Sequence, residues 1–123
     1  MTSTQRIRDY KQLDVWRKSM QLTEEVYRIT ARMPNTERFA LCDQMQRAVV
    51  SIPSNIAEGY GPGSRKEYCQ FIKIARGSAA EVETQLLLTL RLDMLTRDNL
   101  APVLELVAEV RRMLHGLVCS LER

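Results

Sequence analysis

The sequence predicts an all-α protein, an antiparallel up-down-up-down four-helix bundle, and three observations support this. The 5 glycines and 4 prolines are few and mostly grouped into short breaks. Between the breaks, apolar residues recur at spacings of three and four, which is the period of an amphipathic helix. No segment sustains the apolar and polar alternation of a half-buried strand. Short connections between four helices make sequential neighbours antiparallel.

The breaks divide a single predicted domain, residues 1–123, into four helices. Helix-breaking or polar residues occur at 34–35, 59–63 and 96–99. The expected helices span about 14–32, 36–59, 65–95 and 99–122. A chain of 123 residues, 45% of them hydrophobic, buries roughly two thirds of its unfolded surface, which is enough for a core that needs neither disulfides nor a metal.

Local signals mark where these helices begin and end. Asp14 is the expected N-cap of the first helix, and Pro34 ends that helix because proline disfavours helical geometry in the residue before it. Ser64 and Glu67 have the spacing of a capping box at the start of the third helix. Pro102 is expected in the first turn of the fourth helix, where a missing N–H costs little.

Pro53 interrupts the second predicted helix and is expected to kink it. Because proline has no N–H, the carbonyl of Val49, one turn earlier, loses its helical partner. The cost is about 3 kcal/mol unless packing or a nearby polar group offsets it. Ser51, Ser54 and Asn55 are the polar residues closest in sequence, and we expect them to compensate.

The fourth helix has the clearest apolar period in the chain. Its apolar residues step by four, three, four, three and four, which is the spacing of the seam in a bundle helix. The predicted seam comprises Val103, Val107, Val110, Leu114, Leu117 and Leu121.

Cysteine usage and the first ten residues predict a cytoplasmic protein. Cys42, Cys69 and Cys119 are odd in number, far apart and set in apolar helical patterns, so we interpret them as reduced core or near-core thiols. Residues 1–10 contain no apolar signal-peptide core, and no stretch approaches 18 uninterrupted apolar residues. We therefore expect neither secretion nor contact with a membrane.

The titratable residues predict no catalysis. A carboxylate-bridged di-metal centre, the commonest catalytic site of such bundles, needs two Glu-x-x-His pairs, and this chain has a single histidine, His115. We interpret His115 as a surface or boundary residue. No P-loop or dinucleotide fingerprint occurs. The sequence thus predicts a protein that is not an enzyme, with no catalytic residues, no metal site and no cofactor.

Charge is distributed unevenly along the chain. Residues 1–76 contain 13 basic and 8 acidic residues, which gives a net charge of +5. The remaining residues contain 5 basic and 7 acidic residues, a net charge of −2, so the whole chain has +3. Arg17, Arg28 and Arg32 fall within about 60° of one another on a helical wheel. The candidate nucleic-acid-binding residues are Arg17, Lys18, Arg28, Arg32, Arg47, Arg65, Lys66 and Arg76. A merely solvated basic face is the alternative, since two glutamates lie within one turn of Arg28.

A second apolar stripe on the first helix predicts a self-association surface. Trp16, Met20 and Tyr27 lie roughly a quarter-turn from the stripe that faces the core. A bundle helix needs about one apolar stripe, and surplus apolar surface usually marks an interface. Ordinary wide burial of these three side chains is the alternative.

Two motifs resemble those of a known family. Residues 51–59 read Ser-Ile-Pro-Ser-Asn-Ile-Ala-Glu-Gly, and 74–78 and 81–86 follow at that family's spacing. Residues 13–16 and Phe71 match its pattern as well. Over nearly its whole length, the chain resembles the four-helix bundle family named after proteins encoded in intervening sequences of bacterial 23S ribosomal RNA genes, the S23 ribosomal protein family.

The resemblance implies an antiparallel four-helix bundle that assembles as a homopentamer, through heterologous contacts that close into a ring. It implies no known catalysis and brings no established ligand residues. The family is also similar to the accessory proteins of diversity-generating retroelements, which bind nucleic acid and a reverse transcriptase.

The residues and the resemblance together support two functional hypotheses. In the first, a non-enzymatic oligomeric bundle binds RNA or DNA through arginine and lysine side chains that contact phosphates without reading sequence. In the second, the chain is a protein-interaction or scaffold module with no nucleic-acid role, and its apolar stripe and acidic C-terminal half dock partners. Binding of nucleic acid that weakens with salt separates the first from the second.

Overall fold

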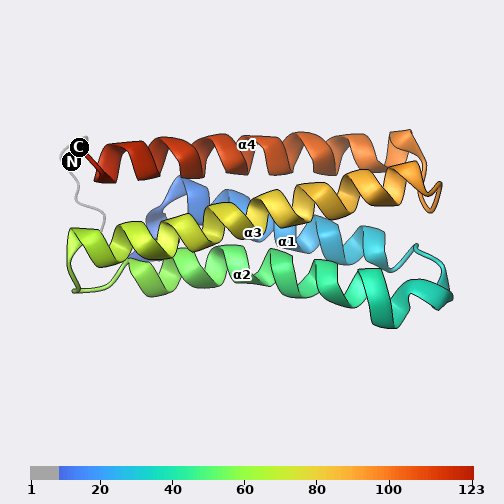
Figure 1. Ribbon diagram of the computed structural model, residues 1–123, viewed down its shortest axis with the longest axis horizontal. Helices are drawn as coiled ribbons and strands as arrows, with labels where there is room; N and C mark the ends of the chain where they lie inside the picture. The colour runs from blue at the N-terminus through green and yellow to red at the C-terminus, as the bar shows by residue number, and fades with distance from the viewer. Residues whose placement is uncertain (1–8) are drawn as a thin grey trace.

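Four long helices make up most of residues 9–123, the part of the chain that the computed structural model describes (Figure 1). They are α1 (Asp14–Thr30), α2 (Asp43–Gly59), α3 (Arg65–Arg91) and α4 (Arg97–Leu121). Short 3₁₀ turns at Tyr10–Gln12 and Asn35–Glu37 and a π-helical turn at Arg38–Cys42 lie between or before them. Residues 1–8, which the single-domain prediction includes, lie outside the described part.

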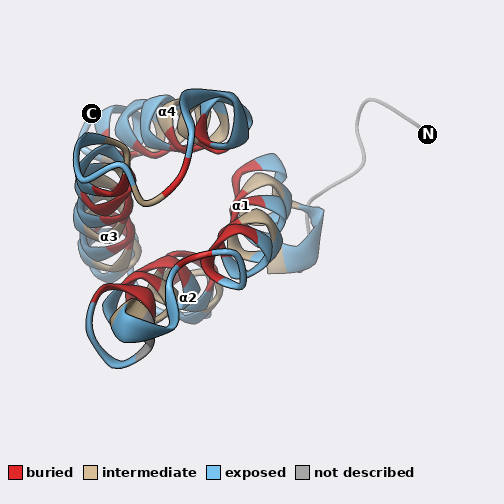
Figure 2. Cartoon of the chain, turned by 90° about the vertical axis from the view of Figure 1, so that its right-hand side faces the viewer, coloured by how far each residue is buried: buried red, intermediate tan, exposed pale blue. Residues whose placement is uncertain are grey.

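The helices pack beside one another in the order of the sequence. α2 packs against α1 and α3, and α4 packs against α3 and closes the bundle against α1. In the end-on view of Figure 2, the buried faces of all four helices turn toward one shared interior. The predicted all-α, antiparallel four-helix bundle is confirmed.

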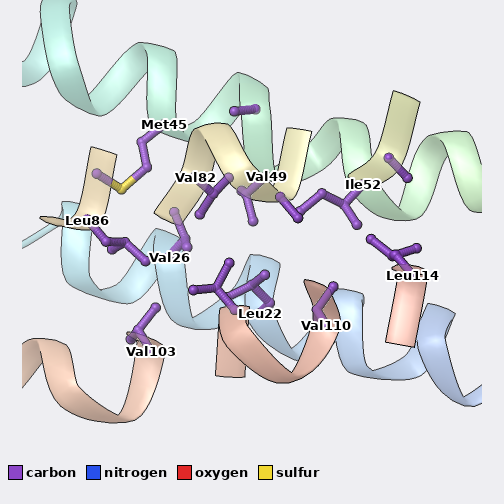
Figure 3. Packing of buried hydrophobic residues seen from close by; sticks show 14 of the residues in the cluster. Leu22, Val26, Met45, Val49, Ile52, Val82, Leu86, Val103, Val110 and Leu114 are labelled. Atoms are coloured by element: carbon purple, nitrogen blue, oxygen red, sulfur yellow. The ribbon is translucent and has the colours of Figure 1, made fainter. Parts of the chain in front are cut away.

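Aliphatic side chains at the apolar positions of each helix build the interior. Figure 3 shows them pointing toward one another from all four helices. The labelled side chains are Leu22 and Val26 of α1, Met45, Val49 and Ile52 of α2, Val82 and Leu86 of α3, and Val103, Val110 and Leu114 of α4. Each is 1% exposed or less. Full burial of one such side chain stabilises the fold by about 1.5–3 kcal/mol, so the core is the main source of stability.

The seam of α4 departs from the prediction near its C-terminal end. Leu114 is buried as expected, but Leu117 and Leu121 are only half-buried, whereas Val118 is 2% exposed. The reason is that an α-helix has 3.6 residues per turn, so a strict alternation of three and four residues drifts away from the core along its length. A final step of four, from Leu114 to Val118, returns the seam to the interior.

The start of α3 has the predicted capping box. The Glu67 backbone N–H donates to Ser64 Oγ (3.1 Å), and the Ser64 backbone N–H donates to Glu67 Oε1 (2.8 Å). The bond from the Ser64 backbone N–H, and to a smaller extent one with the Ser64 side chain, lowers the pKa of the Glu67 carboxyl group. The start of α1 differs: Leu13 is at the N-cap position without a side-chain bond, so the predicted cap at Asp14 is wrong. Asp9 instead caps the preceding 3₁₀ turn.

The middle two helices have boundaries that differ from the predicted ones. Residues 35–42 turn with 3₁₀ and π spacing before α2 begins at Asp43, rather than near residue 36. α3 ends at Arg91 rather than near residue 95, and Asp93 has a left-handed φ of 57°. Aspartate tolerates this backbone conformation better than most residues because its short side chain can hydrogen-bond locally.

The fourth helix begins earlier than predicted. Thr96 Oγ1 accepts from the Asn99 N–H at 3.2 Å and so acts as the N-cap, which starts α4 at Arg97. Pro102 is therefore the sixth helical residue and does not lie in the first turn as predicted. The carbonyl that it leaves without a helical donor is that of Asp98, and because Asp98 is exposed, water can bond this carbonyl.

A side chain of α1 lies beside the carbonyl that Pro53 leaves without a helical donor. α2 runs through Pro53, which is buried. The Thr23 hydroxyl lies 3.4 Å from the Val49 carbonyl oxygen and also donates to a carbonyl of its own helix at 2.8 Å. Asn55 donates to the Ser51 carbonyl instead (2.8 Å). The compensating donor thus comes from the neighbouring helix rather than from the predicted residues close in sequence.

Small residues let α2 and α3 approach closely. Ser51 Oγ lies 2.9 Å from Ser78 Oγ, and Asn55 Nδ2 donates to the same Ser51 Oγ at 3.0 Å. A Cβ added to Gly59 would lie 2.6 Å from Phe71 Cβ, closer than carbon atoms can pack. The glycine and the two serines therefore determine the separation of these helices.

Gly59→Ala is expected to destabilise the fold by about 1–3 kcal/mol, because the new methyl group would overlap Phe71 and push α2 away from α3. Gly77→Ala is the matched control. Nothing lies within 4 Å of a Cβ added there, so its higher helix propensity should stabilise the fold by about 0.5–1 kcal/mol. Urea unfolding followed by circular dichroism measures both changes. Equal effects of the two substitutions would contradict the contact assigned to Gly59.

Thr23→Val is expected to cost about 1–2 kcal/mol, because the Val49 carbonyl then lacks a donor. In a Pro53→Ala background the restored N–H can serve this carbonyl, so the same substitution should cost less than about 0.5 kcal/mol. Thr84→Val, which removes an exposed hydroxyl bonded to its own helix at 2.9 Å, is the control. Urea unfolding measures these changes as well. If Thr23→Val costs the same free energy of unfolding with Pro53 as in the Pro53→Ala background, Thr23 does not donate to the Val49 carbonyl.

Candidate nucleic-acid interface

The candidate basic residues of α1 are engaged with acceptors in the same chain. The pairs are Arg17 with Asp14 (4.0 Å), Lys18 with Glu109 (3.4 Å), Arg28 with Glu25, and Arg32 with the side-chain oxygen of Asn99 (3.2 Å). Exposed ion pairs of this kind each contribute only about 0–1 kcal/mol to stability. The carboxylates nevertheless offset the charges of Arg17, Lys18 and Arg28. Arg32 bonds a neutral amide and keeps its charge, so the basic stripe of α1 is compensated over most but not all of its length.

Three further candidates lie on other elements. Arg47 of α2 pairs with Asp43 one turn earlier (3.2 Å). Arg65 donates to two carbonyls at the C-terminus of α4 (2.8 and 3.0 Å), so its guanidinium caps that helix. Lys66, next to it at the start of α3, is exposed. These three candidates thus lie on α2 and at the start of α3, and both arginines are held by contacts within the chain.

Arg76 of α3, in contrast, meets basic side chains of α4. The two helices form a pocket of about 340 Å³, here called the basic pocket, which is lined by Arg76, Glu83, Ala108, Arg111, Arg112 and His115. Its three guanidinium groups and one carboxylate leave a net charge of +2 when the histidine is neutral. Glu83 pairs with Arg111 and orients it, whereas Arg112 forms no ion pair with any described side chain.

The antiparallel register of α3 and α4 creates the basic pocket. Arg76 Nη1 lies 3.3 Å from His115 Nδ1 although 39 positions separate the two residues. The charge count along the sequence missed Arg111 and Arg112 because they belong to the acidic last third of the chain. The spacing of 111, 112 and 115 on one side of a helix, away from the apolar seam, is the local signal that could have identified them.

An ion pair lies one turn of α3 away from Arg76. Lys73 Nζ is 2.7 Å from Glu122 Oε2. The hydrogen bond from Lys73 lowers the pKa of Glu122, and the same bond raises the pKa of Lys73. Because Glu122 offsets its charge, Lys73 adds little to the positive field of the basic pocket.

The predicted interface residues of α1 are partly exposed. Trp16 is half-buried against the core, with Tyr10 edge-to-face at a ring distance of 5.4 Å, while Met20 is 38% and Tyr27 45% exposed. Sequence reasoning missed Phe39, which is 88% exposed and lines a pocket of about 500 Å³ together with Tyr27. The apolar surface thus extends from α1 to the turn that precedes α2.

The cysteines differ in their surroundings. Cys42 and Cys69 are buried and form no disulfide, as predicted, but Cys119 is exposed, so its assignment to the core or near-core is wrong. Cys119 Sγ lies 3.7 Å from Nε2 of His115, which is exposed as predicted. The exposure of Cys119 follows from the shift of the α4 seam, because Val118 faces the interior in this turn.

Residues 9–123 contain neither a clustered set of metal ligands nor a membrane-spanning helix. No group of three or more His, Cys, Asp or Glu side chains in this part of the chain is placed to hold a metal ion. Of the helices described here, none combines the length and the apolar content needed to cross a bilayer.

Comparison with known proteins identifies the family. A model of the 23S rRNA-intervening sequence protein family matches residues 11–116. The chain belongs to this family. It is similar to a protein with unknown function from the S23 ribosomal protein family of Bacteroides thetaiotaomicron VPI-5482, whose crystal structure was solved at 1.70 Å. The two sequences are 25% identical, and the structures superpose with a TM-score of 0.79. The match covers 85% of this chain and 97% of that chain. No curated protein matches.

In this member of the family, Lys73→Gln is expected to return the pKa of Glu122 toward its ordinary value of 4.5, because the bond from Lys73 is the largest cause of the lowering. The lowered pKa means that Glu122 contributes to stability above its unfolded-state pKa, and this contribution is lost as pH falls through the folded value. The raised pKa of Lys73 acts oppositely, with a contribution that is lost as pH rises through the folded value.

An NMR titration of the side-chain carboxyl carbons measures this change. Glu67 is the internal control, because its pKa is lowered by Ser64 and should stay lowered in the Lys73→Gln variant. A pKa of Glu122 that does not move in the variant would rule out Lys73 as the cause.

Proposed function

We propose that this family member is a non-enzymatic, self-associating bundle that binds RNA through the basic pocket and contacts phosphates rather than reading bases. The observation that supports this most is the convergence of Arg76, Arg111 and Arg112 on α3 and α4. A guanidinium matches a phosphate with two parallel hydrogen bonds and stays charged at physiological pH. Contacts of this kind position a nucleic acid but carry no sequence information.

The pairing pattern determines which of these cations are available to a phosphate. Arg111 is bound to Glu83, so its guanidinium is oriented but partly neutralised. Arg112 pairs with no described carboxylate, although two glutamates of α4 border its other side, along a second pocket. Arg76 contacts an imidazole rather than a carboxylate. We therefore expect Arg76 and Arg112 to contribute most to phosphate binding.

Exposed apolar side chains support the self-association. Phe39 is 88% exposed and Tyr27 45% exposed, at the end of the bundle where α1 turns into α2. The homopentamer that the family resemblance implies would cover such surface. Five copies of the basic pocket would also bind an extended RNA far more tightly than one copy, with a steep dependence on salt.

The same apolar surface favours a second candidate, a protein-interaction or scaffold module with no nucleic-acid role. In this alternative Phe39 and Tyr27 dock a partner protein, and the basic pocket is simply solvated. Salt separates the two candidates, because binding between apolar surfaces does not collapse with added salt whereas binding to phosphates does.

The double substitution Arg76→Gln with Arg112→Gln is expected to weaken binding of a labelled ribosomal RNA fragment at least about tenfold at low salt. It should also reduce the slope of log affinity against log salt by about 2, since each lost phosphate contact removes about 1. Fluorescence anisotropy at several salt concentrations measures both, with a random-sequence duplex as a second ligand.

Arg28→Gln with Arg47→Gln is the matched control for this experiment. It removes the same number of positive charges, but each is paired with a carboxylate, so the affinity should change less than about threefold. Light scattering verifies that each variant keeps the mass of the wild-type assembly, which for a pentamer is five times the 14.2 kDa of the chain. Equal weakening by both double variants would contradict a role of the basic pocket. Absence of binding by an intact oligomer would leave the scaffold module.

A further inference from the structure

A thiol, an imidazole and a guanidinium are in contact at the edge of the basic pocket. Cys119 Sγ lies 3.7 Å from His115 Nε2, and His115 Nδ1 lies 3.3 Å from Arg76 Nη1. Cys119 and His115 are both exposed, one turn apart on α4. We propose that Cys119 is a modification site whose thiolate exchanges with small anionic disulfides.

The direction of the hydrogen bonds determines the tautomer of His115. A guanidinium can only donate, so Arg76 Nη1–H donates to His115 Nδ1, which must carry a lone pair. We therefore assign the proton of the neutral imidazole to Nε2, where it points at Cys119 Sγ. The imidazole donates toward the sulfur, and the positive charge of Arg76 lies behind the ring. The Cys119 sulfur thus has a hydrogen-bond donor beside it, from which the attacking thiolate can accept.

The basic pocket selects the charge of the reagent. The pocket has a net charge of +2, and His115, which contacts Cys119, is one of the residues that line it. Glu122, the carboxylate closest to Cys119 in sequence, is bound to Lys73 at 2.7 Å, so its charge is offset. A field of this sign raises the local concentration of anions and repels cations. Disulfides that carry carboxylates, such as glutathione disulfide, are the class that fits.

The other two thiols are protected from such reagents. Cys42 and Cys69 are each 6% exposed. Cys42 Sγ also contacts Met33 Sδ (3.6 Å) and the Thr30 carbonyl (3.8 Å) in the interior. The modification is therefore confined to Cys119.

The reaction is thiol–disulfide exchange. The Cys119 thiol releases its proton to solvent, and the thiolate attacks one sulfur of the reagent. A bond between Sγ and that sulfur forms as the disulfide bond of the reagent breaks, and the departing thiolate takes up a proton. Cys119 is oxidised and the departing half of the reagent is reduced, so the exchange needs no further oxidant.

Reaction rates with two probe disulfides test the proposal on the full chain. The probes are dithiobis(nitrobenzoate), a dianion, and cystamine, a dication. Each rate is divided by that of a small neutral thiol with the same probe, which removes the intrinsic reactivity of the reagent. We expect the normalised rate to favour the anion about tenfold at low salt, and this preference to shrink as salt is added. Peptide mapping after treatment with glutathione disulfide should locate the adduct on Cys119, and Cys119→Ser should abolish the fast phase.

Two variants separate the imidazole from the charge. His115→Leu should slow both probes about three- to tenfold. Arg76→Gln with Arg112→Gln should bring the anion preference to within about twofold of unity. Arg28→Gln with Arg47→Gln, which removes two carboxylate-paired charges, should retain the preference. Circular dichroism verifies that each variant is folded.

Three results would each overturn the proposal. They are an adduct on Cys42 or Cys69 instead of Cys119, normalised rates that show no preference for the anion, and a rate that His115→Leu leaves unchanged. None of these measurements involves RNA, so their outcome is independent of whether the basic pocket binds nucleic acid.

Discussion

The close contact between α2 and α3 is the constraint on which the arrangement of the bundle depends. Gly59 leaves room for Phe71, and Ser51 bonds to Ser78, so the separation and the register of the two helices are set together. α3 carries this register along its 27 residues to the contact with α4, where Arg76 meets a histidine. A slip of one residue would rotate α3 by about 100° relative to its neighbours and break both sets of contacts.

The residues that carry the family resemblance are concentrated at this contact. The 51–59 motif includes Ser51 and Gly59, and the 74–78 motif includes Ser78. The roles seen for them are packing and hydrogen bonding between helices. Membership in the 23S rRNA-intervening sequence protein family therefore accounts for the fold. The basic pocket lies at the other contact of α3, with α4, and most of its lining residues lie outside both motifs.

Charge pairing determines what the basic residues can do. An exposed ion pair such as that of Lys18 with Glu109 contributes only about 0–1 kcal/mol, so these pairs matter little for stability. They matter more for recognition, since a paired cation must give up one anion to bind another. Arg76 and Arg112 form no ion pair with a described carboxylate, so neither has to release one to bind an anion at the α3–α4 contact.

The sequence by itself determined the number of helices, the inward face of each except at the end of α4, and the capping box of α3, because period and caps depend on residues within one or two turns. It did not determine that Thr23 lies beside the Val49 carbonyl, or that Arg76 meets His115. The rotation and register of one helix against another come from packing among side chains far apart in the chain. The exposure of Cys119 was decided in the same way. The apolar seam of α4 turns gradually away from the core along the helix, and only the packed structure shows which residue of the last turn faces the interior.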